Sequence, residues 1–306
     1  MPLSIRPFEE QDAPALTARF SEDARAPWLR LPYPFTLDKL LEPGSGLDVF
    51  VAAPQPERVV GLIAFDRRGT DPLMVGPLVS DEQLADLYVR ALMGHGLDWA
   101  RDGGLTHVRV KVDLGEERGL SFFLNQGFQL LESRQYLLAA RRGIRRPAPT
   151  PFEGVRFGLS PEMLSSDYLR LYQELGWSER LAWSRPKVFE HLQQPGVHLL
   201  SARAGDTYLG FAELQVRHDA AELSHFGVLP AFRGRGVGSA FLEHVLTFAF
   251  EQLELERVWV ATLMGEADKG PMPFFTKRGF RQERALVYLE KKLIPAASAL
   301  NASSIS

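Results

Sequence analysis

The residues best suited to chemistry form a glycine-rich turn between two regular elements. An apolar run ending at Val228 is followed by the turn Arg233–Ser239, and an amphipathic segment begins at Ala240. This order predicts a strand, a tight turn and a helix. Glycines let the backbone approach a ligand closely, and the first N–H groups and positive dipole end of the helix point at whatever occupies the turn. The expected occupant is a phosphate group.

Two familiar phosphate-binding motifs do not fit this turn. A P-loop requires Lys-Ser or Lys-Thr after its last glycine, and no Lys follows Gly238. The dinucleotide pattern G-x-G-x-x-G requires a glycine where Ser239 stands, in a strand–helix–strand unit that opens the fold. The pattern that remains is R-x-x-G-x-G from Arg233 to Gly238, preceded by Val-x-Pro at 228–230.

This pattern, with its preceding strand and following helix, resembles the pyrophosphate loop of the GNAT superfamily of acyl-CoA-dependent N-acyltransferases. The resemblance implies that acetyl-CoA, or another acyl-CoA, is the cosubstrate. It further implies that pantetheine lies along the preceding strand, where a backbone N–H polarises the thioester carbonyl. The residues thereby assigned to the cosubstrate are Phe226, Gly227, Val228, Arg233, Gly234, Arg235, Gly236, Val237, Gly238 and Ser239. Asp268 stands roughly where the family has a CoA-contacting Asn, although it also suits a helix N-cap before Pro271.

Acyl transfer to an amine also requires a base that neutralises the ammonium. Glu222 lies eleven residues before Arg233, the distance at which histone-acetylating members of the superfamily carry a catalytic glutamate. The resemblance therefore implies that Glu222 is the general base. Strand alternation places Glu222 on the same face as Ser224 and Phe226, so water could relay the proton. The alternative is a strand-end carboxylate in solvent.

Other polar side chains near this strand have less defined roles. Histidine is the side chain that titrates near neutral pH, but strand alternation turns His225 to the opposite face, so we expect it to be structural. Glu213 on the neighbouring strand, with His218 and Asp219 in the turn between, could line the acceptor pocket.

The resemblance breaks at the proton donor for the leaving thiolate. Many GNAT members carry a Tyr four residues before the glycine of a closing Gly-Phe pair, and this position is Phe275 here and Phe123 in the first half of the chain. Phenylalanine cannot donate a proton. The thiolate therefore leaves unassisted, as its modest pKa allows, or Thr276, Tyr288 or water donates the proton.

The elements that would position these residues occur twice. Self-comparison finds the same landmarks at an offset of about 150 residues, which indicates two copies of one unit. The matching segments are Val59–Ala64 with Tyr208–Glu213, His107–Val112 with Arg257–Thr262, and Phe122–Phe128 with Phe274–Phe280. Each copy is predicted to contain a strand, one or two helices, three antiparallel strands, a long helix, and then strand, helix and strand.

The predicted fold class is α+β, or mixed α/β, with two consecutive GNAT folds, each a mixed, mainly antiparallel sheet flanked by helices. Residues 1–140 are expected to form a degenerate GNAT-like domain and residues 152–293 the catalytic, acyl-CoA-binding domain. Residues 141–151, rich in Arg and Pro, are expected to be a linker with a solvated basic cluster. The small, polar tail 294–306 is expected to be disordered.

The two halves are not equivalent at the turn. The first half has no glycine there and carries Asp81, Glu82 and Asp86, which would repel a pyrophosphate at a cost of several kcal/mol. Ser80 instead resembles an ordinary helix N-cap. We therefore expect the first half not to bind CoA in this manner and to help build the acceptor pocket.

Composition narrows the class of protein. The formal net charge of −3 over 306 residues gives no reason to expect a nucleic-acid partner. No apolar run of about 18 residues and no leader is found, so no membrane partner and a cytoplasmic location are expected. The absence of cysteine excludes disulfides, thiolate metal ligands and an acyl-cysteine intermediate. We expect no metal, and a monomer or homodimer.

The leading hypothesis is an N-acetyltransferase that transfers acetyl from acetyl-CoA to a primary amine of a small molecule. The alternatives are a module that binds or senses acyl-CoA without turnover, and a transferase of another acyl group. A purely structural scaffold leaves Arg233–Gly238 unexplained. Trp177, Trp183 and Tyr172 could wall the acceptor pocket, although aromatic residues at helical spacing usually belong to the core.

Overall fold

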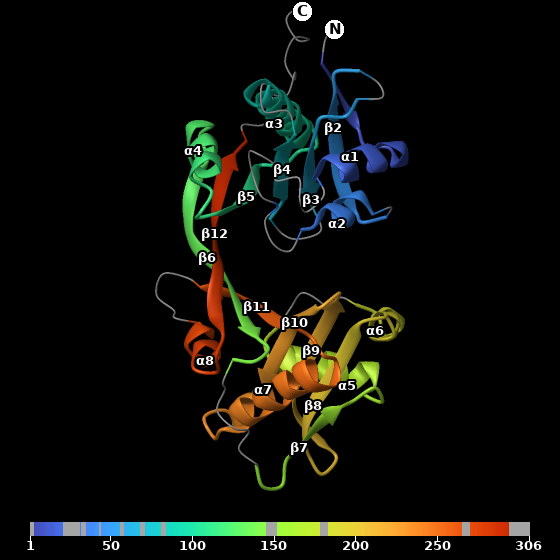
Figure 1. Ribbon diagram of the computed structural model, residues 1–306, viewed down its shortest axis with the longest axis vertical. Helices are drawn as coiled ribbons and strands as arrows, with labels where there is room; N and C mark the ends of the chain where they lie inside the picture. The colour runs from blue at the N-terminus through green and yellow to red at the C-terminus, as the bar shows by residue number, and fades with distance from the viewer. Residues whose placement is uncertain are drawn as a thin grey trace, which may run out of the picture. The chain divides into compact units, whose positions relative to one another are not determined.

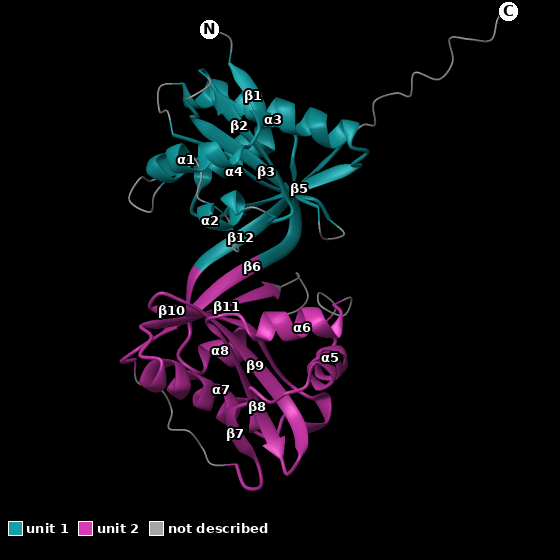
Figure 2. Ribbon diagram, turned by 90° about the vertical axis from the view of Figure 1, so that its right-hand side faces the viewer, with its two compact units in different colours: residues 1–134, 284–306 teal, residues 135–283 magenta. Residues whose placement is uncertain are grey.

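The computed structural model forms two compact units (Figures 1 and 2). Unit 1 comprises Met1–Arg134 with Arg284–Ser306, and unit 2 comprises Gln135–Glu283. The structure describes residues 3–20, 31, 35–42, 44–55, 58–67, 71–80, 84–144, 152–177, 183–264 and 270–293.

Unit 1 contains a mixed sheet with the strand order β1-β2-β3-β4-β5-β12. Neighbouring strands run antiparallel except β4 and β5, which are parallel. The long helix α3 packs against β2, β3 and β4. The elements, in chain order, are β1 (Ser4–Pro7), η1 (Glu10–Asp12), α1 (Ala13–Phe20), α2 (Leu37–Leu41), β2 (Leu47–Ala53), β3 (Gly61–Asp66), β4 (Leu73–Val79), α3 (Ala85–Asp102), β5 (His107–Asp113), α4 (Glu117–Asn125) and β6 (Gln129–Arg141).

Unit 2 repeats this plan with the strand order β7-β8-β9-β10-β11-β6. The pairs β7–β8, β8–β9 and β9–β10 are antiparallel, and β10–β11 is parallel. The elements are β7 (Arg156–Leu159), α5 (Ser165–Glu174), α6 (Arg185–Leu192), β8 (Val197–Ala204), β9 (Thr207–Arg217), β10 (Ala220–Val228), η2 (Pro230–Phe232), α7 (Val237–Thr247), η3 (Phe248–Gln252), β11 (Arg257–Met264), α8 (Met272–Thr276) and β12 (Arg281–Lys292).

The sheet of unit 2 has an apolar cluster on each face. Alternate residues of β9 divide between the two clusters: Ala212 and Leu214 pack with α7 residues such as Phe241, whereas Phe211 packs with Tyr168 and its neighbours on α5. Helix α7 thus covers one face, and α5 and α6 cover the other (Figure 1). Because side chains of a strand alternate between faces, one strand can serve both cores.

The compact units do not follow the expected boundaries at 140 and 293. Strand β6 begins in unit 1 and ends in unit 2, and β12 does the reverse (Figure 2). Residues Leu286–Lys292 of β12 pair antiparallel with Asp113–His107 of β5. Val287 and Leu289 accordingly lie in the core of unit 1, whereas Leu138 of β6 lies in the core of unit 2. Each repeat therefore supplies the strand that completes the other repeat's sheet.

Side-chain ion pairs also join β12 to β5. The Nε of Arg109 lies 2.9 Å from Glu290 Oε2, and the Nε of Arg284 lies 2.7 Å from Asp113 Oδ2. Partly exposed pairs of this kind contribute about 1 kcal/mol or less each. The buried apolar residues of β12 therefore contribute more to its attachment than the ion pairs do.

We expect a fragment of residues 1–140 to fail to fold on its own, because it lacks β12 and exposes the edge of β5. Circular dichroism and amide NMR dispersion should show a disordered or molten fragment. Fusing residues 281–293 to its C-terminus through a flexible Gly/Ser linker should restore cooperative unfolding. A well-folded 1–140 fragment with dispersed amide signals would contradict the inference that each repeat needs the other repeat's last strand to fold.

A buried lysine lies at the β5–β12 pairing in unit 1. Lys111 is 7% exposed, and its ammonium lies 5.1 Å from the ring centroid of Tyr288. Burial lowers the pKa of Lys111 to about 8, against the opposing effect of Asp66. Burial also raises the pKa of Tyr288 to about 12. A charged ammonium in this position therefore destabilises unit 1 at neutral pH.

Lys111→Met should stabilise unit 1 at pH 7 by up to about 3 kcal/mol, since each pKa unit corresponds to about 1.4 kcal/mol. Between about pH 8 and the ordinary value of 10.5 the unfolded chain binds more protons than the folded one, so wild-type stability rises with pH there. The variant should lack this rise. Urea titrations of the unit 1 transition at pH 7 and pH 10 measure both effects, with the exposed Lys292→Met as the matched control.

Candidate active site

A cavity opens in unit 2 where two parallel strands separate. Strands β10 and β11 pair only from Ala220–Glu222 to Arg257–Trp259. Beyond this point both strands border a cavity of about 670 Å³. Its lining consists of Trp177, Leu223, Ser224, His225, Phe226, Gly227, Val228, Arg233, Gly234, Gly236, Gly238, Ser239, Val260, Ala261, Thr262, Pro271, Phe274 and Phe275. The predicted glycine turn and the separating strands therefore meet at one site.

A bulge in β10 lies at the point of separation. Leu223 pairs with Leu214 of β9, but the next pair is His225 with Glu213, so Ser224 is an extra residue in β10. A bulge interrupts the alternation of faces and bends the strand. His225 therefore shares the face of Glu222, and both Ser224 and His225 border the cavity, as the rest of the β10 edge from Leu223 to Val228 does. The expectation that His225 belongs to the opposite, structural face was wrong in this respect, because it assumed unbroken alternation.

The turn after β10 depends on backbone conformation. Gly234 and Gly236 have φ values of +73° and +89°, which other residues adopt only with strain. Added Cβ atoms would meet nothing within 4 Å at Gly234 and only Phe152 at 3.8 Å at Gly236, so conformation rather than space requires glycine here. Arg233 Nε donates a hydrogen bond to the Val228 carbonyl at 2.8 Å, which ties the turn to the end of β10.

The N-terminus of α7 faces this cavity. Gly236 is the N-cap, and no side chain caps the helix. The first N–H groups of a helix lack partners within it and carry partial positive charge. Because Gly236, Gly238 and Ser239 line the cavity, this end of the helix is suited to bind an anion.

Gly238 differs from the other two turn glycines. It lies in the first turn of α7, and its φ is not positive. A Cβ at this position would meet Val228 Cγ2 at 3.6 Å and Phe274 at 3.9 Å, which are ordinary contacts. Neither conformation nor packing within the protein requires glycine at 238. The absent side chain instead leaves space in the cavity.

An aromatic wall closes the cavity over the middle of β10. An added Cβ at Gly227 would lie 2.9 Å from Leu175 Cδ2 and 3.0 Å from Trp177. Glycine at 227 therefore allows the segment after α5 to pack directly on the strand. Trp177, which could have been a core residue or a pocket wall, contacts both the core and the cavity.

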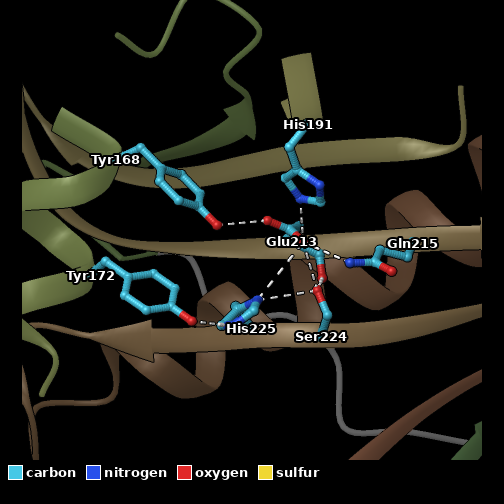
Figure 3. A network of polar contacts seen from close by, with 7 residues as sticks. All are labelled: Tyr168, Tyr172, His191, Glu213, Gln215, Ser224 and His225. Atoms are coloured by element: carbon cyan, nitrogen blue, oxygen red, sulfur yellow. Dashed lines mark hydrogen bonds and ion pairs between the residues drawn. The ribbon is translucent and has the colours of Figure 1, made fainter. Parts of the chain in front are cut away.

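A network of polar side chains lies beside this wall (Figure 3). At its centre the carboxylate of Glu213 is 0% exposed. It accepts hydrogen bonds from the hydroxyls of Tyr168 and Ser224 at 2.9 Å each. Gln215 Nε2 also donates to it at 2.9 Å, and His191 Nε2 lies 3.1 Å away. A buried carboxylate is costly unless it is hydrogen-bonded or paired in this way. Glu213 is thus buried behind the cavity rather than lining it.

His225 connects this network to the cavity. Its Nε2 is hydrogen-bonded to the Tyr172 hydroxyl at 2.8 Å, and its Nδ1 to the Ser224 hydroxyl at 3.2 Å. The same Nδ1 lies 3.8 Å from Glu213 Oε1. The imidazole is also packed against Trp177, with ring centroids 5.2 Å apart. The sequence alone did not indicate that these polar residues are neighbours. The packing of helices on the sheet and the bulge in β10 bring them together.

The structure brings together most of the residues assigned to the cosubstrate. Those that line the cavity are Phe226, Gly227, Val228, Arg233, Gly234, Gly236, Gly238 and Ser239. Two others do not: Val237 is buried in the core, and Arg235 is exposed outside the lining. Asp268 lies outside the described residues, as do Asp81 and Glu82 of the first half.

Glu222 lies before the bulge and outside the cavity lining. It pairs with Gln215 on β9 and with Trp259 on β11, and its side chain is half-buried. The shared face predicted for Glu222 and Phe226 does not survive the insertion of Ser224. The assignment of Glu222 as general base stays a prediction, and it now requires a relay around this point.

The aromatic side of the cavity contains no tyrosine at the expected donor position. Phe275 is 4% exposed and packs against Phe226, Phe274 and Phe280. Of the alternative donors, Thr276 is exposed and donates to the Pro273 carbonyl. Tyr288 belongs to unit 1, where it pairs with Lys111.

Within the part of the chain that the structure describes, no cluster of three or more His, Asp or Glu side chains could hold a metal ion. The described helices also include none that combines the length and apolar character needed to cross a bilayer.

Comparisons with known proteins give a family match for part of the chain and matches of fold over nearly all of it. Residues 165–280 match the Acetyltransferase (GNAT) family model. A tandem GNAT protein from the clavulanic acid biosynthesis pathway is similar in structure, with a TM-score of 0.74, 17% identity, and coverage of 96% of this chain and 100% of that one. A GCN5-related N-acetyltransferase from Sphaerobacter thermophilus gives a TM-score of 0.69, 16% identity and 96% coverage of both chains. Comparison with curated protein sequences gave no match.

Proposed function

Residues 165–280 form a domain of the GNAT acetyltransferase family within a chain of two consecutive GNAT folds, and from this premise we propose that the protein is an acyl-CoA-dependent N-acetyltransferase. It transfers acetyl from acetyl-CoA to a primary amine of a small molecule. The observation that carries the proposal is the cavity itself, where an anion-binding helix N-terminus adjoins a separated strand edge.

The cavity matches the two ends of a CoA thioester. The glycine turn and the start of α7 suit a pyrophosphate, and Gly238 leaves the room that such a group needs. The edge of β10 from Phe226 to Val228 faces the cavity instead of pairing with β11. Backbone N–H and C=O groups along an open edge can pair with an extended ligand. Pantetheine, with its two amides, is such a ligand, and an N–H here can polarise the thioester carbonyl.

Direct attack is the mechanism that this chain supports. It has no cysteine for an acyl-enzyme. The acceptor nitrogen therefore bonds to the carbonyl carbon while the carbon–sulfur bond breaks, once the ammonium has lost a proton. Holding both substrates in one cavity makes this step effectively unimolecular.

Phe275 favours the alternative of an acyl-CoA-binding module without turnover, because a phenyl ring cannot protonate the leaving thiolate. A coenzyme thiolate is nevertheless a stable leaving group. Thiol release separates the two functions directly. A transferase of another acyl group would be distinguished by comparing acetyl-CoA with longer acyl-CoA esters.

Acetyl-CoA should raise the melting temperature, because a ligand that binds only the native state stabilises it. Calorimetry should give one site per chain, since the sequence of the first half has no glycine at the matching turn. A panel of primary amines should then release thiol from acetyl-CoA. Two sites of similar affinity would contradict the inference that the first repeat does not bind acetyl-CoA in this manner. Binding without thiol release for any amine would support the non-catalytic module.

Gly238→Ala should separate ligand binding from stability. Alanine is favoured over glycine in a helix by about 0.5–1 kcal/mol, and the added methyl meets only ordinary contacts. The variant should therefore be more stable than the wild type without ligand. It should bind acetyl-CoA about tenfold or more weakly, because the methyl overfills the ligand's space.

Gly94→Ala in α3 is the matched control for this change. A Cβ there meets nothing within 4 Å, and Gly94 lies within a helix of unit 1. It should raise stability similarly and leave acetyl-CoA affinity unchanged. Equal acetyl-CoA affinity of Gly238→Ala and the wild type would place the pyrophosphate elsewhere.

A further inference from the structure

We propose that Ser224 and His225 are the residues that remove the proton from the acceptor ammonium, with the buried Glu213 as the positioning residue that stabilises the resulting imidazolium. The assignment rests on the proposed N-acetyltransferase function and identifies the base for it. It places the base at the bulge of β10, whereas the resemblance to the superfamily implied Glu222, which lies before the bulge.

The open edge of β10 puts two consecutive polar residues at the cavity. All residues from Leu223 to Val228 line it, and Ser224 and His225 are among them. They stand directly before the residues Phe226–Val228 that suit the thioester. A base must lie within hydrogen-bond reach of the proton that it removes, directly or through one intermediary. These two side chains meet that requirement, and Glu222 is not part of the lining.

The hydrogen bonds form a continuous path from the cavity to the buried carboxylate (Figure 3). The Ser224 hydroxyl lies 3.2 Å from His225 Nδ1 and 2.9 Å from Glu213 Oε1. The opposite ring nitrogen of His225 is held by the Tyr172 hydroxyl at 2.8 Å. The imidazole is therefore fixed at both nitrogens, as a positioned proton acceptor should be.

Glu213 gives this path its electrostatic driving force. Its carboxylate is fully buried and lies 3.8 Å from His225 Nδ1. The carboxylate attracts the positive charge that the imidazole carries after it has taken the proton. The donors from Tyr168, Gln215 and His191 keep the carboxylate in place while the imidazole gains and loses charge.

The proton transfer balances without another reagent. In the tautomer whose Nε2–H donates to the Tyr172 oxygen, Nδ1 of His225 accepts, and the Ser224 hydroxyl turns from Glu213 towards it. The ammonium passes a proton to Ser224 Oγ while the serine hydroxyl proton moves to His225 Nδ1, which leaves a neutral amine and an imidazolium. The amine nitrogen then bonds to the carbonyl carbon, the carbon–sulfur bond breaks, and a second nitrogen proton goes to the sulfur. The products are the amide and the free thiol. The imidazolium returns its proton to solvent.

Several groups face His225 from the elements packed against it. These are Tyr172 of α5 and Glu213 of β9, and behind Glu213 lie Tyr168 of α5 and His191 of α6. The carboxylate of Glu213 lies within 4 Å of both His225 and His191.

The test compares Ser224→Ala, Glu213→Gln and Glu222→Gln in the full chain. Each is measured with acetyl-CoA and the amine that releases thiol fastest from the panel. Ser224→Ala and Glu213→Gln should each lower kcat by about 10²-fold near neutral pH, with the acetyl-CoA melting shift retained. The loss should shrink as pH rises, because the acceptor is then already neutral. Glu190→Gln, an exposed change next to His191 on α6, serves as the matched control.

The outcomes separate this assignment from the function on which it rests. Ser224→Ala deletes one oxygen, so it tests the path even where Glu213→Gln unfolds. Full activity of Ser224→Ala, or a loss that is equal at every pH, would show that the network is structural only. A loss confined to Glu222→Gln would return the role of base to that residue. A wild type that binds acetyl-CoA but releases no thiol with any amine would overturn the proposed function and this assignment with it.

Discussion

The site depends on one constraint, the early end of the pairing between β10 and β11. Their parallel ladder extends only from Ala220–Glu222 to Arg257–Trp259. Had it continued, the backbone of Phe226–Val228 would be satisfied within the sheet and no cavity would exist. The bulge at Ser224 bends β10 at this point. The separation exposes a strand edge, places the glycine turn beside it, and brings Ser224 and His225 to the same space. Binding surface and polar chemistry thus arise from a single irregularity.

Local chemistry made the turn predictable from sequence. A backbone position with positive φ, or a helix start that must approach a ligand closely, requires glycine, so the residue type itself indicates such a position. Gly234 and Gly236 confirm the first kind through their conformation, and Gly238 has the steric freedom expected of the second. The internal repeat could also be recognised in the sequence, because each copy must bury the same apolar faces. The fold comparisons agree with two consecutive copies.

Non-local pairing was not predictable in the same way. The last strand of each repeat was expected to belong to its own repeat, yet β12 pairs with β5 and Leu138 of β6 joins the core of unit 2. Alternating apolar residues indicate that a strand has a buried face, but they do not specify which other strand pairs with it. The bulge could not be predicted for a related reason, because the extra residue of a bulge has no characteristic residue type. This one residue in β10 places His225 on the same face as Glu222, opposite to the prediction.

The polar network shows why the base and the binding turn draw on different parts of the sequence. The turn is contiguous, because a phosphate needs several neighbouring N–H groups. A proton acceptor needs a buried counter-charge, and burying Glu213 requires donors from several directions. These come from α5, α6, β9 and β10, which are separate in sequence and converge only when the helices pack on the sheet. A base of this kind has no motif. It is found by asking which buried carboxylate needs so many partners, and which of those partners reaches the cavity.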